Sequence, residues 1–290
     1  MKKHISIVGA NSFIGRNLAA HLLTSGCTLS LYDRDAAHFD NLDGYQPLNL
    51  LDPDSLSPVD FSSDVFFFFT GLTGTKQGFD DPNLYVDVNE KMLLCFLDAY
   101  RKRESKGKIV FLSSRLVYKG AEEPLREEAE KEFKTIYAIN KFACEQYLKM
   151  YGEMFHVPYC ILRLCVPYGS AISGARSYGT VGFFEQCARQ GKNIPLYGDG
   201  SLRRTFTHMT DLCEILRAAA FHEACAQNVY NIGGQNLSLL QAAQAIGTRF
   251  GVGVDHVPWP AEALRLETGH TVFDSGKLDA VLRHRYRTDF

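Results

Sequence analysis

The chain has 290 residues, enough for one large domain or two fused domains. Its 46% hydrophobic and 22% charged residues are ordinary for a globular protein and argue against intrinsic disorder. With 31 basic and 33 acidic residues, the net charge of −2 gives no whole-molecule field for nucleic acid or anionic lipid. We therefore expect neither nucleic acid nor a membrane as a partner, although net charge does not exclude a local basic patch on the surface.

The sequence predicts no membrane helix and no secretion signal. Its longest notable apolar run, 65–69, is far short of the roughly 20 residues that a membrane helix needs. The lysines at 2–3 and the apolar residues after them faintly resemble a signal peptide, but Gly9, Asn11 and Ser12 interrupt that segment. A buried strand is the better interpretation of this segment.

Eight cysteines are scattered along the chain. None belongs to a Cys-x-x-Cys pair, and no histidine lies at a zinc-like offset from two of them. We expect reduced, structural thiols in a cytoplasmic protein, and no metal site.

In its first half the chain alternates short apolar runs with segments of helical periodicity. The apolar residues that follow Phe13 recur at helical spacing, and Gly26 is a typical helix stop. The run 65–69 is apolar throughout, which is typical of a strand covered on both faces. Strands are expected at 5–8, 28–32, 46–51, 65–69, 108–112 and 159–164, and further helices at 83–103 and 137–151.

This alternation predicts an α/β fold, a Rossmann-type doubly wound parallel sheet with helices on both faces. Beyond residue 167 the pattern loosens, and helices at 182–190, 211–222 and 239–250 mix with short strands. We expect 1–166 to form a dinucleotide-binding domain, to which later segments return. Residues 167–290 are then mainly a smaller mixed α/β substrate lobe. The acidic stretch 122–132 is interpreted as a solvated loop.

A glycine-rich segment joins the first expected strand to the first helix. Gly9 and Gly15 permit a tight turn and close backbone approach, and the helix start offers free N–H groups to a pyrophosphate. Ser12 stands where a second glycine is usual, so its hydroxyl could bind a phosphate oxygen. An ordinary strand–helix turn is the alternative. The expected cofactor contacts here are Gly9, Ser12, Phe13, Ile14 and Gly15.

Asp33 ends the second expected strand. A carboxylate there can accept hydrogen bonds from both ribose hydroxyls and repels a 2′-phosphate, which favours NAD over NADP. Arg34 follows at once and could instead meet a 2′-phosphate, and Asp33 could be a simple turn residue. Leu51 and Asp52 follow the third expected strand, where a carboxylate could reach the adenine.

Tyr137 and Lys141 are the main catalytic candidates. Residues four apart share one helix face, and a nearby ammonium favours the phenolate, lowering the tyrosine pKa from about 10. The tyrosine can then act as an acid or base near neutral pH. Ser113 and Ser114 close the strand just upstream, and Ser114 could hydrogen-bond the oxygen that Tyr137 protonates.

Together these residues resemble the extended short-chain dehydrogenase/reductase family, specifically its nucleotide-sugar epimerase/dehydratase branch. The resemblance covers nearly the whole chain. It rests on the fingerprint 9–15, the serine segment 111–118, the pair Tyr137 and Lys141, the segments 162–169 and 197–211, and Asn231-Ile-Gly-Gly.

The resemblance implies an NAD-dependent enzyme that acts on a nucleotide sugar, with Ser114, Tyr137 and Lys141 as its catalytic residues. It places Arg204 on the nucleotide diphosphate. It also implies a homodimer through the helices 83–103 and 137–151, where Leu93, Leu94, Phe96 and Leu97 offer apolar surface. Besides Tyr137 and Lys141, further expected cofactor contacts are Thr70, Gly71, Leu72, Asn89 and Ser113.

Three departures from the family pattern narrow the activity. Arg115 and Leu116 replace the acidic pair of the dehydratases, which argues against sugar 4,6-dehydration. Val166 replaces a common asparagine, and Thr73 stands where some epimerases place a phosphate-binding lysine. We expect Thr73, Ser114, Arg115 and Val166 to line the substrate site, although Arg115 could equally be a solvated strand-end residue.

Epimerisation at C4 through a transient keto sugar is the first functional hypothesis, because it needs only the minimal catalytic set. A reductase of 4-keto nucleotide sugars would use the same three residues but release its cofactor. A non-catalytic dinucleotide sensor is the third hypothesis. Such a sensor would be expected to lose one of the three residues, and this chain keeps them all.

Overall fold

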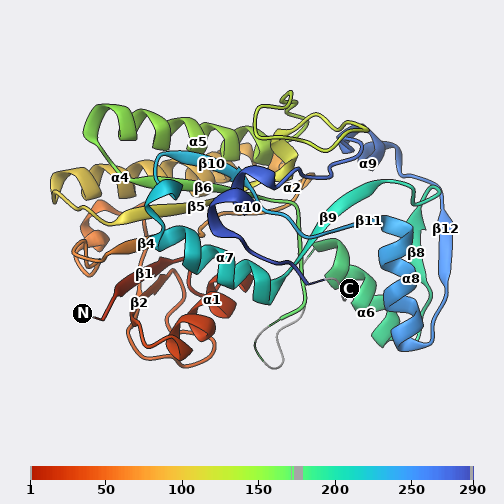
Figure 1. The fold of residues 1–290 in the computed structure, drawn as a ribbon, viewed down its shortest axis with the longest axis horizontal. Helices are drawn as coiled ribbons and strands as arrows, with labels where there is room; N and C mark the ends of the chain where they lie inside the picture. Colours follow the sequence, from red (N-terminus) through yellow and green to blue (C-terminus); the bar gives the residue numbers. More distant parts are fainter. Residues whose placement is uncertain (1, 171, 173–178, 288–289) are drawn as a thin grey trace.

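A computed structural model describes residues 2–170, 172, 179–287 and 290. Its main feature is a seven-stranded sheet with the order β10-β6-β5-β4-β1-β2-β3, in which every neighbouring pair is parallel (Figure 1). The strands are β1 (His4–Val8), β2 (Thr28–Asp33), β3 (Tyr45–Pro47), β4 (Val65–Phe68), β5 (Lys108–Ser114), β6 (Tyr159–Leu164) and β10 (Asn228–Asn231).

Helices cover both faces of this sheet (Figure 1). On one face lie α1 (Phe13–Thr24), α7 (Met209–Phe221) and α10 (Gly276–Leu282), and on the other lie α4 (Met92–Lys102) and α5 (Ile136–Phe155). The strand β4 contributes side chains to the apolar cores on both faces. Val65 and Phe67 pack in the core beside α1 and α7, while Phe66 and Phe68 pack in the core beside α4 and α5. This two-sided burial explains the uninterrupted apolar run, because neither face of a covered parallel strand meets water.

The third expected strand is shorter than the pattern 46–51 indicates. The strand β3 pairs only with β2, at the edge of the sheet, and ends at Pro47. Leu48 and Leu50 continue as buried side chains of the core that contains α4, outside any strand. Pro47 has no N–H to donate, although Leu48 still donates its own N–H to Asp33 O on β2 at 2.7 Å. The 3₁₀ turn η1 (Pro53–Leu56) follows.

The long helix expected at 83–103 is interrupted. After the short α2 (Gln77–Asp80), α3 (Pro82–Val86) runs into a π-helical turn, η2 (Asp87–Lys91), and only then into α4. Apolar periodicity identifies the helix but does not reveal a single extra residue within it.

The apolar surface expected for a dimer is largely core. Leu93, Phe96 and Leu97 are fully buried, so they offer no surface to a partner, and that part of the expectation is wrong. These three residues pack toward the sheet, as one face of a covering helix must.

A smaller lobe follows β6 (Figure 1). It contains a three-stranded sheet and a parallel strand pair around its own apolar cluster. Chain segments nonetheless return from it to the large sheet, since β10 and α7 belong there. The boundary at residue 166 stays a prediction. The elements are β7 (Val166–Tyr168), α6 (Gly179–Arg189), β8 (Ile194–Tyr197), β9 (Arg203–His208), β11 (Gln235–Ser238), α8 (Leu239–Phe250), β12 (Val254–Val257) and α9 (Ala261–Leu266).

The acidic stretch 122–132 is not simply a solvated loop. Leu125 is 3% exposed, and its N–H donates to Val272 O at 2.7 Å. Glu127 is also buried, because its carboxylate accepts the N–H of Asn231 at 2.8 Å. Charge alone suggested exposure to solvent, but these hydrogen bonds hold the stretch against Val272 and against β10.

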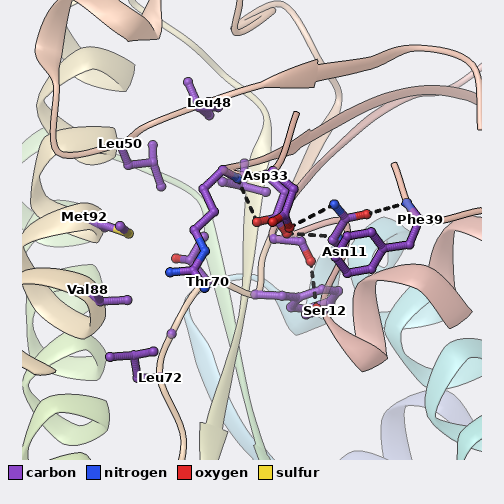
Figure 2. Close-up of a pocket in the computed structure, with 16 residues that line it drawn as sticks. Asn11, Ser12, Asp33, Phe39, Leu48, Leu50, Thr70, Leu72, Val88 and Met92 are labelled. Atoms are coloured by element: carbon purple, nitrogen blue, oxygen red, sulfur yellow. Dashed lines mark hydrogen bonds between the residues drawn. The ribbon is translucent and has the colours of Figure 1, made fainter. Parts of the chain in front are cut away.

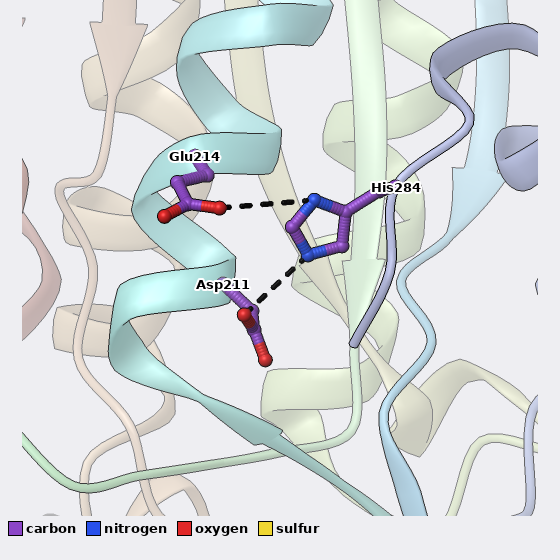
Figure 3. A group of neighbouring side chains, drawn as sticks. All are labelled: Asp211, Glu214 and His284. Atoms are coloured by element: carbon purple, nitrogen blue, oxygen red, sulfur yellow. Dashed lines mark ion pairs between the residues drawn. The ribbon is translucent and has the colours of Figure 1, made fainter. Parts of the chain in front are cut away.

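Near the chain's end, His284 lies between Asp211 and Glu214 of α7 (Figure 3). The three could offer ligands to a metal, but Arg287 already pairs with both carboxylates, at 3.4 and 4.0 Å. Arg287 thus already occupies both carboxylates of this group. Within the described residues, none of the helices is long and apolar enough to span a bilayer. All eight cysteines are free thiols.

Candidate active site

The turn between β1 and α1 lies close against the backbone that follows β4. Gly9 has φ +94°, and a Cβ there would lie 2.7 Å from the carbonyl carbon of Phe69, so only glycine fits. Ser12 caps α1: its hydroxyl accepts the N–H of Gly15 at 3.0 Å and donates to Gly9 O at 2.7 Å. Its hydroxyl is therefore engaged within the turn, and the free first-turn N–H groups are what α1 offers an anion.

Asp33, at the end of β2, is held by two backbone N–H groups. Its carboxylate accepts from Asn11 at 2.9 Å and from Arg34 at 2.8 Å. Burial raises the pKa of this carboxyl, and the two hydrogen bonds oppose that rise. Arg34 is exposed. The carboxylate thus stands at the carboxyl edge of the sheet, where the fold places a ribose.

Sequence analysis missed Asn11. Its side-chain amide donates to Asp35 at 3.1 Å and to Ala37 O at 3.0 Å, and its carbonyl accepts from Phe39 N at 3.0 Å. One side chain therefore shapes the loop after β2. The position of an amide within the glycine-rich turn was the available signal, because such side chains commonly bond nearby backbone.

A pocket of about 310 Å³ opens at this edge, where β1 lies between β2 and β4 (Figure 2). Asn11 and Ser12 line one side, and the apolar side chains of Leu50, Val88 and Met92 line the other. Seven expected cofactor residues contribute to its wall: Gly9, Ser12, Asp33, Arg34, Thr70, Gly71 and Leu72.

Leu51 and Asp52 do not line this pocket; Leu48 and Leu50 occupy that part of its wall. Leu48 and Leu50 point inward because they belong to the core beside α4. The roles assigned to Leu51 and Asp52 stay predictions.

The π-helical turn links the pocket to the catalytic helix. It contains Asn89, which is buried and whose side-chain oxygen accepts the N–H of Leu72 at 2.7 Å. A Cβ on Gly71 would lie 2.9 Å from that oxygen and 3.7 Å from the Nζ of Lys141. Asn89 O also accepts the thiol of Cys144 on α5 at 2.9 Å. The pocket loop, the π turn and α5 therefore meet at one point.

Lys141 and Tyr137 lie one turn apart near the start of α5. Lys141 is buried, and its Nζ donates to Leu112 O at 3.0 Å. The same atom lies 4.6 Å from the Phe111 ring centroid and 5.9 Å from that of Tyr137. Burial lowers the pKa of Lys141. The ammonium thus sits between the cofactor loop and the tyrosine, as their shared helix face predicts.

Ser114 is the last residue of β5 and begins the 3₁₀ turn η3 (Arg115–Val117). Its Oγ accepts the N–H of Leu116 at 3.2 Å, which leaves its hydroxyl proton available to a ligand. Ser113 Oγ and Thr70 Oγ1 are buried without a hydrogen-bond partner in the described chain. Buried polar atoms normally have partners, so these two indicate a polar ligand beside the pocket. The site therefore fits a dinucleotide.

The expected substrate residues are more scattered. Val166 packs in the core of the smaller lobe, and Thr73 O accepts the hydroxyl of Tyr85 at 2.7 Å. Arg204 is 2% exposed and already bound: its guanidinium donates to Arg203 O and Gly269 O and pairs with Glu267. Its role on a diphosphate stays a prediction, and it would require an exchange of partners.

The match to known families settles the membership of the chain. The model described as "NAD dependent epimerase/dehydratase family" matches residues 5–233. The chain belongs to this family. The expected family, Rossmann-type fold and NAD cofactor are thereby confirmed, and the protein is an enzyme of the extended short-chain dehydrogenase/reductase type.

Individual relatives are more distant. The chain is 28% identical over 275 residues to a UDP-N-acetyl-alpha-D-glucosaminuronate decarboxylase of Bacillus cytotoxicus, covering 89% of this chain and 84% of the relative. It is 26% identical over 274 residues to a CDP-paratose 2-epimerase of Salmonella typhi, covering 81% of each. The solved structure of epimerase Mth375 from Methanothermobacter thermautotrophicus superposes with a TM-score of 0.88. The superposition covers 100% of this chain and 89% of the Mth375 chain at 19% sequence identity, which shows a shared fold.

Proposed function

We propose that this protein epimerises a nucleotide-activated sugar at C4, through a transient 4-keto sugar. The observation that carries the proposal is the placement of Lys141, whose Nζ lies beside both the Gly71 loop of the cofactor pocket and the ring of Tyr137. A non-catalytic sensor would not need that juxtaposition. The epimerase and decarboxylase relatives support an activated sugar as substrate. We place the reaction in the cytoplasm on the eight free thiols.

The residues of the chain divide the work. Tyr137 takes the proton from the sugar's 4-hydroxyl and later returns it, and the charge of Lys141 stabilises the phenolate. Ser114 donates its free proton to the same sugar oxygen. When bound, NAD supplies the acceptor for the carbon-bound hydride and the donor for its return. Arg115 and Leu116 offer no carboxylate beside Ser114, so 4,6-dehydration lacks an acid–base pair there.

Cofactor binding is assigned to four groups of residues. The turn Gly9–Gly15 and Ser113 serve the phosphates and nicotinamide side, and Asp33 and Arg34 serve the adenosine ribose. Thr70, Gly71 and Leu72 form the connecting loop, which Asn89 of the π-helical turn holds. Leu51 and Asp52 are retained toward the adenine.

The test is a single assay with added NAD and a panel of UDP- and GDP-linked hexoses, followed by NMR at C4. We expect interconversion of the two C4 epimers without net change in NADH, and none with Tyr137→Phe. Stoichiometric consumption of NADH or NADPH by a 4-keto nucleotide sugar, without epimerisation, would instead establish the reductase.

A further inference from the structure

Arg115 follows the catalytic Ser114 directly and is half-buried. Its Nη1 lies 3.4 Å from the hydroxyl oxygen of Thr268 and 3.5 Å from that of Thr271, at the long limit of hydrogen bonding. Both threonines are buried, so they hold one end of the guanidinium in place. A guanidinium has five N–H donors, and only those on Nη1 have protein partners in the described chain.

In the described part of the chain Arg115 forms no ion pair, although one carboxylate, Glu267, lies on the same segment as its threonine partners. That carboxylate is committed elsewhere: it pairs with Arg204 and accepts the N–H groups of Thr268 at 2.9 Å and Gly269 at 3.0 Å.

The charge of Arg115 affects the pKa of the neighbouring Arg204. Burial, followed by the charge of Arg115, lowers the pKa of the Arg204 guanidinium to about 10. Two guanidiniums and one carboxylate thus leave an excess positive charge beside Ser114. A half-buried cation without a carboxylate partner is costly unless a ligand supplies the anion.

We propose that Arg115 binds a carboxylate on the substrate, so that the sugar is a uronic acid carrying its C6 carboxylate beside the reacting C4. This inference rests on the proposed C4 chemistry. Ser114 donates a hydrogen bond to the oxygen on C4, and the adjacent ring carbon, C5, bears C6. We therefore assign the residue next to Ser114 to the C6 substituent, with the nucleotide diphosphate on C1, across the ring. A guanidinium and a carboxylate can form two parallel hydrogen bonds, and a neutral C6 hydroxyl cannot form this bidentate pair.

Arg115 would also protect the substrate during the reaction. A 4-keto uronic acid is a β-keto acid. In its decarboxylation the C5–C6 bond breaks, C6 leaves as CO₂, and the bond's electron pair passes to the C4 carbonyl, giving an enolate that takes a proton at C5. An Arg115 guanidinium hydrogen-bonded to the carboxylate stabilises its negative charge, which the formation of CO₂ would remove, and so disfavours the loss.

The experiment compares UDP-glucuronate with UDP-glucose, and GDP-mannuronate with GDP-mannose, using the full chain with NAD. Within each pair the sugars differ only at C6. We expect wild-type kcat/KM to favour the uronate, and Arg115→Gln to lower it about 10- to 100-fold, the loss of a charged hydrogen bond. Arg115→Lys should recover part of it, and the loss with the neutral sugar should be much smaller than the loss with the uronate. Arg126→Gln, at an exposed arginine paired with Asp274, is the matched control.

A second readout is the partition of the uronate between C4 epimer and CO₂, which a purely structural role of Arg115 would not change. We expect Arg115→Gln to raise the CO₂ fraction, while its melting temperature and NAD affinity stay near those of wild type. Equal turnover of neutral and uronic sugars, unaffected by Arg115→Gln, would overturn the inference and leave the epimerase intact. Absence of C4 epimerisation with either member of both pairs would overturn the proposed function instead.

Discussion

Glu145 on α5 and Arg163 on β6 form a bidentate ion pair, with N–O distances of 2.9 and 2.6 Å, almost completely shielded from solvent. Glu145 follows Lys141 by one helical turn. Arg163 also donates to the hydroxyl of Tyr118 at 2.6 Å, and Tyr118 follows Ser114 by four residues. This pair therefore links α5 to the serine segment without contacting Ser114, Tyr137 or Lys141.

Removing one member of the pair should be costly. Glu145→Gln leaves the Arg163 charge buried and unpaired, so we expect a loss of about 3–5 kcal/mol in the free energy of unfolding, measured by urea denaturation. Glu130→Gln is the control, because its pair with Lys119 is exposed and should contribute little. A Glu145→Gln protein as stable as that control would show that water or a rearranged partner compensates Arg163.

The catalytic assignment predicts an order of effects. Tyr137→Phe removes one hydroxyl and keeps the ring, so fold and NAD binding should survive while kcat falls by about 10² to 10⁴. Lys141→Ala should do comparable harm and also weaken NAD, because its Nζ lies beside the Gly71 loop. Ser114→Ala should be milder, since the acid–base group remains. Steady-state kinetics and NAD titrations measure both effects, and near-normal turnover by Tyr137→Phe would assign the proton to another group.

Cofactor selection should depend on the ionisation of Asp33. NAD(H) should bind more tightly than NADP(H), because the carboxylate accepts ribose hydroxyls and repels a 2′-phosphate. Burial raises the pKa of Asp33, and protonation removes the acceptor. NAD affinity should therefore fall on acidification, beginning at a higher pH than for an ordinary aspartate.

Calorimetric titration of the wild-type protein and of Asp33→Asn across the acidic range checks this. The variant should bind NAD more weakly and lose the pH dependence. An unchanged slope in the variant would place the titrating group elsewhere.

Association should use α5 rather than the residues first expected. Ile139, Met150 and Met154 lie along one stripe of α5 and are 48%, 47% and 67% exposed. We propose that this stripe forms a homodimer, and that Met154→Glu shifts it toward monomer in light scattering at micromolar concentration. Leu23→Glu is the control, since Leu23 is 46% exposed on α1, across the sheet. A monomeric wild-type protein would contradict the proposal.

Sequence reasoning worked best where a single local rule decides the structure. The limits of β6 and of α8 were predicted to the residue, because an apolar run and a capped amphipathic stretch each mark their own ends. The closeness of Tyr137 and Lys141 was also predictable, since the two residues share a helix face.

What the sequence did not reveal depends on partners far away along the chain. The sequence identifies Arg204 as a cation, but only the fold brings Glu267 to it. Likewise, the acidic character of 122–132 suggested exposure to solvent, whereas the buried carboxylate of Glu127 accepts a hydrogen bond from the N–H of Asn231. Such pairings depend on chain crossings that composition and periodicity do not encode.

The π-helical turn imposes a constraint of length on the segment Asp87–Lys91. A π turn is an α-helix with one residue inserted, and each α-helical residue advances the chain by about 100°. Substitutions at its exposed positions leave that geometry intact. Deleting Asp87 or Val88 would restore a regular helix and rotate Asn89 away from Leu72. The spacing between Pro82 and Met92 is therefore as much a determinant of activity as the identity of any side chain within it, and a family member shortened there would need another way to hold its cofactor loop.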